Sequence, residues 1–421
     1  MGGDMVAQDM PRDEGLDRTL NVLKEGYGFI MNRREALNTD VFETRIMGEK
    51  AICLTGSEAA ELFYDDTRFR RRDAAPARVE KTLFGEGGVQ TLDEEAHYNR
   101  KGMFMSLMDD EAMDEIGMLV PQYWQLYFKE AGSLETVSLY EAAKVVFLQV
   151  ACKWTGVPLE DPEKETLASR ISDLYESPAA LGIQHWKGRR SRSKVNDWIE
   201  GLVEDVREGR IEVDQGKALY TFSWHRDEKG NLLDKKTVAV EILNLIRPMN
   251  AVSVWVAMIG LALHEFPEEK HKLKGADDIE LEWFIQEVRR YYPFFPFAAA
   301  RTDADFEWQG YSFEAGTLTL LDLYGTNRHP SDWVDPDIFM PERFKGWQQT
   351  PFNFIPQGGG SYDFGHRCAG EFVTIVMMRE TLDFLVNHLA YDVPDQDFSF
   401  EFNDIPAVPN DKVKINNFRF L

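Results

Sequence analysis

Cysteine is scarce in this 421-residue chain, which contains only Cys53, Cys152 and Cys368. An odd number of cysteines at wide spacing is not a disulfide framework, and it predicts a reducing compartment, the cytoplasm. The sequence also has no CxxC pair and no Cys/His cluster with zinc-finger spacing, which excludes structural zinc sites of those kinds.

The chain is also short of positive charge, with 47 Lys and Arg against 72 Asp and Glu and a net charge of −25. Proteins bind nucleic-acid backbones and anionic lipid through cationic surfaces, so we expect neither partner. A charge of this size is typical of a soluble protein with a self-repelling surface.

No apolar run is long enough to span a bilayer, since the longest covers residues 251–263. Residues 1–20 are polar and acidic, lack the apolar region of a signal peptide, and predict a flexible N-terminal lead. No repeat, low-complexity segment or Pro/Gly/Ser-rich linker divides the remainder. We therefore predict one domain over residues 21–421, with no membrane anchor and a cytoplasmic location.

The apolar pattern predicts a mainly α fold with a minor β part. Residues 40–56 alternate as a hairpin does, a helix follows from Ser57, and helical spacing dominates residues 93–263. After Arg301 the pattern changes to short strands joined by Gly turns and then to loops. A helix is predicted over residues 369–389, with short strands at the end of the chain.

One candidate site is the loop PQGGGSYDFGHRCAGE, which contains three consecutive glycines, Gly358 to Gly360. Such glycines allow unusual backbone angles and the close approach of a flat ligand. Cys368 lies at the predicted start of an apolar helix, where backbone N–H groups favour a thiolate, and His366 and Arg367 add positive charge. The thiolate could be a nucleophile or a metal ligand. The commoner alternative is a small buried cysteine without a chemical role.

A second candidate is the pair Glu287 and Arg290, which share a helix face one turn apart. Taken alone, this is a surface ion pair that contributes little to stability. It gains weight from the motif PERF at residues 341–344, which supplies Glu342 and Arg343.

The third candidate is Arg247, the only charged residue between Glu241 and Glu265. A guanidinium buried in an apolar helix needs an anion, and its planar fork fits a carboxylate at two points. Pro248 removes a backbone hydrogen bond and predicts a kink that opens space beside it. The alternatives are an internal salt bridge and a pocket for an anionic substrate.

Together these features resemble the cytochrome P-450 superfamily, with ExxR at residues 287–290, PERF at 341–344, and a Gly-rich Cys loop leading into a helix. The resemblance covers nearly everything from residue 20 onward. It implies a single P-450-type fold that holds haem b (iron protoporphyrin IX) between the long central helix and the Cys-loop helix. It also implies Cys368 as the axial ligand of the haem iron.

The details are similar to the bacterial fatty-acid peroxygenases. Ser361 and Phe364 stand where the usual P-450 loop has Phe and Gly, and Arg247 and Pro248 replace the acid–Thr pair of monooxygenases. Residues 70–101 also resemble the substrate and haem segment of that branch. The resemblance therefore implies that residues 21–421 form one haem-thiolate peroxygenase domain.

The resemblance implies a role for each of several residues. Catalytic roles fall to Arg247, Pro248 and Gln90, substrate binding to Arg247, Phe84 and Gln90, and the pairing of haem propionates to His97, Lys101 and Arg71. His97 could equally be an ordinary core or surface histidine, and Phe84 could be ordinary core.

The activity implied is hydrogen-peroxide-dependent hydroxylation of long-chain fatty acids at the α or β carbon, with the substrate carboxylate acting as general acid–base. No obligatory redox partner is expected. Gln90 favours hydroxylation, because branch members that decarboxylate fatty acids to terminal alkenes tend to have His there. Four other interpretations are open. They are a peroxide-dependent decarboxylase that forms terminal alkenes, a monooxygenase that uses dioxygen, a haem or lipid carrier, and a haem-free cysteine enzyme.

Overall fold

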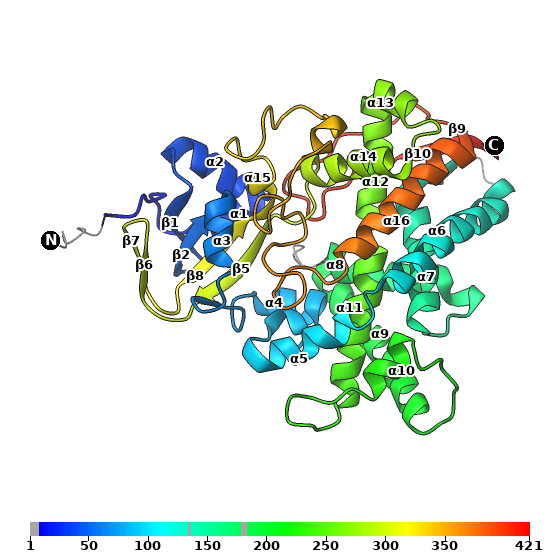
Figure 1. Cartoon of the computed structure of the whole chain (residues 1–421), viewed down its shortest axis with the longest axis horizontal. Helices are drawn as coiled ribbons and strands as arrows, with labels where there is room; N and C mark the ends of the chain where they lie inside the picture. Colours follow the sequence, from blue (N-terminus) through cyan, green and yellow to red (C-terminus); the bar gives the residue numbers. More distant parts are fainter. Residues whose placement is uncertain (1–7, 134–135, 178–182) are drawn as a thin grey trace.

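The computed structural model describes residues 8–133, 136–177 and 183–421. The strands of the N-terminal part and a larger assembly of helices lie side by side (Figure 1). The helices are α1 (Thr19–Glu25), α2 (Gly28–Leu37), α3 (Ser57–Phe63), α4 (Ala77–Val79), α5 (Glu94–Met105), α6 (Asp110–Glu130), α7 (Leu139–Thr155), α8 (Lys164–Glu176), α9 (Ile183–Arg207), α10 (Ala218–Ser223), α11 (Lys235–Ala251), α12 (Ser253–Glu265), α13 (Pro267–Lys272), α14 (Asp278–Tyr291), α15 (Leu323–Thr326) and α16 (Glu371–Asp383). The predicted fold class, mainly α with a minor β part, is confirmed.

The strands are β1 (Val41–Ile46), β2 (Glu49–Leu54), β3 (Phe69–Arg70), β4 (Thr136–Ser138), β5 (Phe297–Thr302), β6 (Phe306–Trp308), β7 (Tyr311–Phe313), β8 (Leu318–Asp322), β9 (Leu389–Asp392) and β10 (Lys414–Phe420). Five of them form a sheet in the order β1-β2-β8-β5-β3, in which only β2 and β8 pair in parallel. The hairpin predicted at residues 40–56 is the β1–β2 pair. Its side chains alternate between two apolar clusters, Phe42 and Cys53 facing α2 and Ile52 and Leu54 facing α3.

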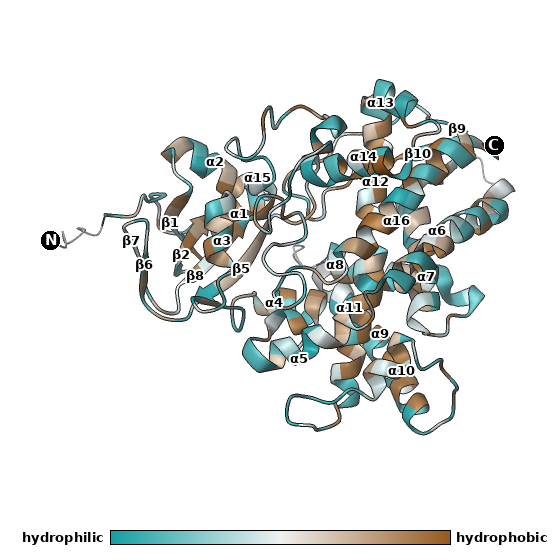
Figure 2. Cartoon of the chain, viewed as in Figure 1, coloured by the Kyte–Doolittle hydropathy of each residue, from teal (hydrophilic) through white to brown (hydrophobic). Residues whose placement is uncertain are grey.

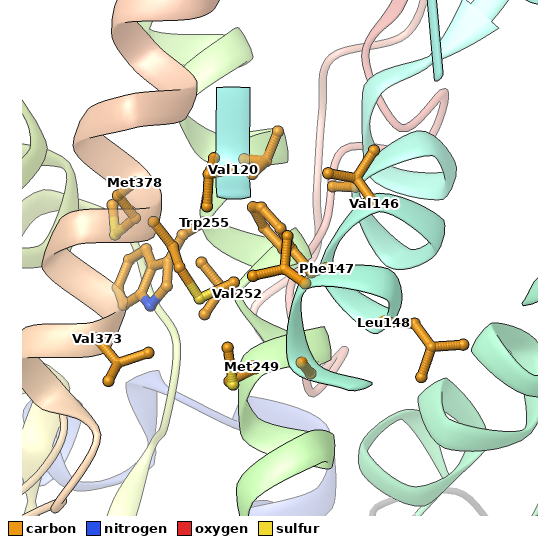
Figure 3. Packing of buried hydrophobic residues seen from close by; sticks show 14 of the residues in the cluster. Val120, Val146, Phe147, Leu148, Met249, Val252, Trp255, Val373 and Met378 are labelled. Atoms are coloured by element: carbon orange, nitrogen blue, oxygen red, sulfur yellow. The ribbon is translucent and has the colours of Figure 1, made fainter. Parts of the chain in front are cut away.

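The core of the helical part is built around α11 and α12. Trp255, Met249 and Val252 pack between Phe147 of α7 and side chains of α16 (Figure 3). Apolar residues line α12, whereas the neighbouring α13 is hydrophilic (Figure 2). By length and composition alone the stretch Lys235–Glu265 could cross a membrane, but 94% of its most apolar window is buried inside the protein. It is therefore a core element of this fold.

The central stretch is interrupted close to the predicted place. α11 continues through Pro248 and ends at Ala251, and α12 begins at Ser253. At the junction, the backbone N–H of Val252 donates to Met249 O at 3.2 Å, which is the spacing of a tighter turn. The interruption thus lies four residues after the proline rather than at it.

The flexible lead predicted over residues 1–20 stays a prediction, although part of it contacts the sheet. Residues 1–7 lie outside the described residues. Pro11 and Asp13 exchange backbone hydrogen bonds with Glu43 of β1 at 2.8 and 2.9 Å, and the Asp13 carboxylate binds Arg33 at 2.6 Å. This segment is held against the sheet because it satisfies the outer edge of β1.

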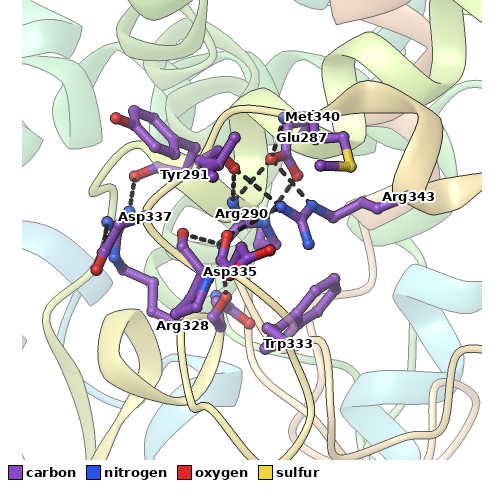
Figure 4. A network of polar contacts seen from close by, with 12 residues as sticks. Glu287, Arg290, Tyr291, Arg328, Trp333, Asp335, Asp337, Met340 and Arg343 are labelled. Carbon is purple, nitrogen blue, oxygen red and sulfur yellow. Dashed lines mark hydrogen bonds and ion pairs between the residues drawn. The ribbon is translucent and has the colours of Figure 1, made fainter.

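The ion pair of α14 is buried and does not lie at the surface. It belongs to a polar network of Glu287, Arg290 and Arg343, which we call the ExxR–PERF lock. Glu287 accepts two hydrogen bonds from Arg290 at 2.7 Å and one from Arg343 at 3.2 Å (Figure 4). The side chains of Glu287 and Arg290 are both 0% exposed. Arg290 also donates to Pro336 O at 2.8 Å, so the lock connects α14 to the loop before PERF. Glu342, by contrast, pairs with Lys272 at the surface.

Removing one partner of this lock leaves an uncompensated buried charge. We expect Glu287→Ala to lower the free energy of unfolding by about 3–5 kcal/mol. The matched change Glu342→Ala, in an exposed pair, should cost about 0–1 kcal/mol. Urea denaturation followed by circular dichroism measures both, and equal effects of the two variants would contradict the structural role of the lock.

Candidate active site

The glycines of the Cys loop shape its backbone. Gly358 and Gly360 have φ angles of 92° and 83°, in the region that disfavours side chains, so the predicted unusual angles are confirmed. A Cβ atom on Gly359 would lie 2.6 Å from Pro351 O, and one on Gly360 would lie 3.1 Å from the Cβ of Tyr64. These glycines also lie close to protein atoms, including Tyr64.

Cys368 differs from the other two cysteines. Cys53 and Cys152 are buried in the core, as the alternative without a chemical role requires, whereas Cys368 keeps part of its surface exposed. Its backbone N–H donates to Gln357 O at 3.3 Å, and its Sγ accepts from Gln357 Nε2 at 3.8 Å.

The Cys368 thiolate stays a prediction, and the sulfur lies three residues before the start of α16. The protein around the sulfur, and after it the Glu371 carboxylate, raise the pKa of the thiol. α16 begins only at Glu371, so the sulfur lies outside the first turn, and the negative charge of Glu371 offsets the effect of the helix N-terminus on the sulfur. A metal cation at the sulfur would supply the missing charge, because a coordinated thiol is deprotonated.

Four nitrogen-bearing side chains gather near this loop: Arg71 after β3, His97 and Lys101 on α5, and His366. The rings of His97 and His366 stack at 3.9 Å, and Lys101 Nζ donates to Arg367 O at 2.5 Å. Burial, and after it Lys101, lower the pKa of His97 to about 4, and burial lowers that of Lys101 to about 8. Arg71 Nη1 is buried and has no hydrogen-bond partner among the described residues.

This arrangement fits a haem. Haem iron needs one strong axial ligand, and its propionates are anions that charged donors stabilise. Cys368 offers the thiolate, and Lys101 with the unpartnered Nη1 of Arg71 offers charged donors for the propionates. Within the described part of the chain, no group of three or more His, Cys, Asp or Glu side chains could hold a metal ion on its own. The roles of His97, Lys101 and Arg71 stay predictions.

Arg247 lies on α11 and is 5% exposed. Its Nη2 donates to Asn244 Oδ1 at 3.0 Å, and its Nε has no partner. No carboxylate of the described residues lies within ion-pair distance of it, which removes the interpretation as an internal salt bridge. Burial, and after it the nearby Arg192, lower the pKa of Arg247 to about 9, so it stays protonated at neutral pH.

Sequence reasoning missed a hydrogen-bond network in which Asn244 connects Arg247 to Glu241 and Gln90. Asn244 Nδ2 donates to Glu241 Oε2 at 2.9 Å and to Gln90 Oε1 at 3.3 Å. Glu241 is fully buried and pairs with Arg100 at 2.6 Å. Because the carboxylate of Glu241 can only accept, the Asn244 amide must turn its oxygen to Arg247. The spacing of three between residues 241, 244 and 247 is the signal that could have indicated a shared helix face.

Phe84 closes the segment Glu80–Phe84, a π-helical turn followed by Gly85 at φ 86°. It packs against an apolar cluster that includes Leu83, Tyr175 and Ala251. A further residue missed from the sequence, Arg192 of α9, is 4% exposed and donates to Leu83 O at 3.2 Å, which holds this segment to α9. The structure brings Gln90 to Asn244 and places Phe84 beside α11, but the roles of Phe84, Gln90 and Pro248 stay predictions.

A cysteine sulfur in a Gly-rich loop, the buried cations Arg71 and Lys101 near it, and the ExxR–PERF lock define a haem-thiolate protein. The model of the family described as cytochrome P-450 matches residues 280–415. The solved structure of cytochrome P-450EX alpha (CYP152N1) with myristic acid is 48% identical, has a TM-score of 0.95, and covers 98% of this chain and 100% of that one.

Two further cytochrome P-450 proteins are similar to this chain. A variant of cytochrome P-450 OleT with arachidonic acid is 36% identical, with a TM-score of 0.95 and coverage of 98% of this chain and 99% of that one. The plant β-amyrin 28-monooxygenase of Kalopanax septemlobus is 22% identical over 413 residues, covering 90% of this chain and 84% of that protein.

The chain belongs to the cytochrome P-450 family, in the CYP152 branch of fatty-acid peroxygenases. The predicted family, the enzyme class and haem b as cofactor are thereby confirmed.

The Cys368 sulfur makes a specific spectroscopic prediction. We expect Cys368→Ala to lose the carbon monoxide band typical of a thiolate-ligated ferrous haem, because no other described side chain offers a thiolate at this loop. Cys152→Ala is the matched control, since that sulfur is buried in the helical core and should leave the band unchanged. A normal band in Cys368→Ala would contradict the ligand assignment.

Proposed function

We propose that this protein hydroxylates long-chain fatty acids at the α or β carbon with hydrogen peroxide, and that Arg247 holds the substrate carboxylate. One observation carries the proposal: a buried guanidinium on α11 has an unpartnered Nε and no carboxylate of its own. A charge in such a site is stable only when an anion answers it, and here the anion must come from outside the described chain.

Arg247 is built to bind a carboxylate in one orientation. Its planar fork offers two parallel donors, and Asn244 fixes the fork by accepting from Nη2. Glu241 and Arg100 fix Asn244 in turn. Because the site is buried, the attraction between guanidinium and carboxylate is much stronger than it would be in water.

When bound, the haem supplies the iron at which the peroxide O–O bond is cleaved, and the Cys368 thiolate favours that cleavage by donating electron density. Cleavage of the O–O bond would also require a proton transfer between the peroxide oxygens. The chain has Arg247 and Pro248 where monooxygenases have an acid–Thr pair, so the carboxylate held by Arg247 serves as general acid–base. Anchoring the head group also places the α and β carbons nearest the oxidant.

The solved relatives support this choice of substrate, since two of them were determined with myristic and arachidonic acid. The absence of an acid–Thr pair at residues 247–248 supports peroxide as oxidant and a reaction without a redox partner. Membership of the P-450 family favours an enzyme over a haem or lipid carrier.

The second candidate function is peroxide-dependent decarboxylation of fatty acids to terminal alkenes. It uses the same Arg247 site. The likeness to cytochrome P-450 OleT keeps it open, and the contact of Gln90 with Asn244 places the residue that we propose as selector within the network that holds Arg247.

A reductant-free reaction tests the proposal. Purified holoprotein is mixed with myristic acid and hydrogen peroxide, and products are identified by gas chromatography–mass spectrometry. We expect hydroxy acids from the natural protein and a loss of about a hundredfold or more in kcat/KM for Arg247→Leu, because a buried charge pair loses one partner.

Arg189→Leu, which removes an exposed cation, should leave turnover unchanged. An unaltered haem spectrum in Arg247→Leu confines the loss to substrate binding. Retained activity in that variant would place the carboxylate elsewhere.

The product ratio tests the role of Gln90. Gln90→His should raise the terminal-alkene fraction several-fold, because an imidazole can carry a proton beside Asn244 where the amide cannot. Gln90→Asn keeps amide chemistry and should leave the ratio near that of the natural protein. An unchanged ratio in Gln90→His would remove this residue as the selector.

A further inference from the structure

The side chain of Gln357 lies between the Cys368 sulfur and a buried ion pair. Its Nε2 is 3.8 Å from Cys368 Sγ and 3.1 Å from Thr374 Oγ1. Its Oε1 accepts from Arg289 Nη2 at 2.9 Å. One side-chain amide therefore joins the loop sulfur to α14 and α16.

The chemistry of the partners fixes which end of this amide faces the sulfur. A guanidinium can only donate, so the carbonyl oxygen of Gln357 must face Arg289. Thr374 donates its hydroxyl proton to Gly370 O at 3.1 Å and accepts from the amide with a lone pair. The NH₂ group is thus the only end available to Cys368, and it has two hydrogens for two acceptors.

The support behind the amide is rigid and charged. Arg289 is 1% exposed and also donates to Glu371 Oε1 at 2.7 Å. Glu371, likewise 1% exposed, accepts at its other oxygen from Arg367 Nε at 2.6 Å. The positive charge of Arg289 on the amide oxygen polarises the group and makes its N–H a stronger donor.

We propose that Gln357 is a positioning residue that donates an N–H···S hydrogen bond to the axial thiolate and thereby sets how much electron density the sulfur gives to iron. The inference rests on the ligation of haem by Cys368, but it does not depend on the substrate or on the reaction outcome. The donor belongs to the side chain at residue 357, so it depends on which amino acid the sequence has there.

The expected consequence follows from charge. A donor at a thiolate withdraws density from the sulfur, and hydrogen bonds to ligating sulfur raise the reduction potential of the metal. Arg289 and Glu371 keep this donor in place, which explains why α14 carries a second buried arginine beside the Glu287–Arg290 lock.

The test compares holoproteins by ferric/ferrous reduction potential and by the C–O stretching frequency of the ferrous carbon monoxide complex. Gln357→Leu removes the donor, and Gln357→Glu keeps the shape and the Arg289 contact but has no N–H. We expect the potential to fall in the order natural protein, Gln357→Leu, Gln357→Glu, with a shift of about tenfold in the one-electron equilibrium for Gln357→Leu, about 59 mV. The C–O frequency should fall in the same order.

Thr374→Val is the matched control. It removes the other acceptor of the same Nε2 and leaves the contact with sulfur, so both values should stay at those of the natural protein. Equal potentials and frequencies in all four proteins would overturn the proposal. If the natural protein had no thiolate-type carbon monoxide band, the ligation of haem by Cys368 would be overturned instead. This outcome distinguishes a failure of the ligand assignment from a failure of the Gln357 proposal.

A measurement on the natural protein covers the case in which the Gln357 variants do not fold. Holoprotein labelled with ¹⁵N at glutamine side-chain amides is examined by pulsed electron paramagnetic resonance in the ferric low-spin state. A hyperfine coupling to one amide nitrogen is expected from the N–H···S contact. Its absence would overturn the proposal without any substitution.

Discussion

A guanidinium buried in a protein is costly unless acceptors satisfy it, and this constraint connects several parts of the structure. Arg290 is answered by Glu287 and Arg289 by Glu371, and both pairs lie within the chain. Arg247 has only an amide oxygen and an unpartnered Nε. The chain supplies the counter-charge of Arg289 and Arg290 itself, and we propose that a ligand supplies that of Arg247.

Helix α14 connects the parts that this constraint holds together. Arg290 donates to the loop before PERF, and Arg289 donates to Gln357 of the Cys loop. Two adjacent residues of one helix therefore hold both loops. Glu287 and Arg290 keep the loop in place, while Arg289 orients Gln357 at the sulfur. The lock and the loop are therefore parts of one buried polar framework, and a half-satisfied framework of this kind would be costly.

The buried region around the proposed haem and substrate sites contains several basic residues, although the chain as a whole is acidic. The chain carries −25, yet Arg71, His97, Lys101 and Arg247 are buried close to the proposed haem and substrate sites. Burial, and after it neighbouring cations, lower the pKa values of His97, Lys101 and Arg247. Such a site favours anions such as propionates and a fatty-acid carboxylate even though the outer surface repels them.

The sequence by itself determined the fold class, the β1–β2 hairpin, the family and the residue at the loop sulfur, because periodicity, glycine runs and ExxR–PERF spacing are local signals. It also indicated that Arg247 needs an anion. Only the tertiary structure decided that no carboxylate of the described chain answers it, that Glu287 is buried with Arg343, and that Gln357 meets Cys368. These depend on contacts between residues far apart in the chain. Side-chain burial and the direction of a hydrogen bond arise only when distant elements pack together, and neither can be read from spacing along one segment.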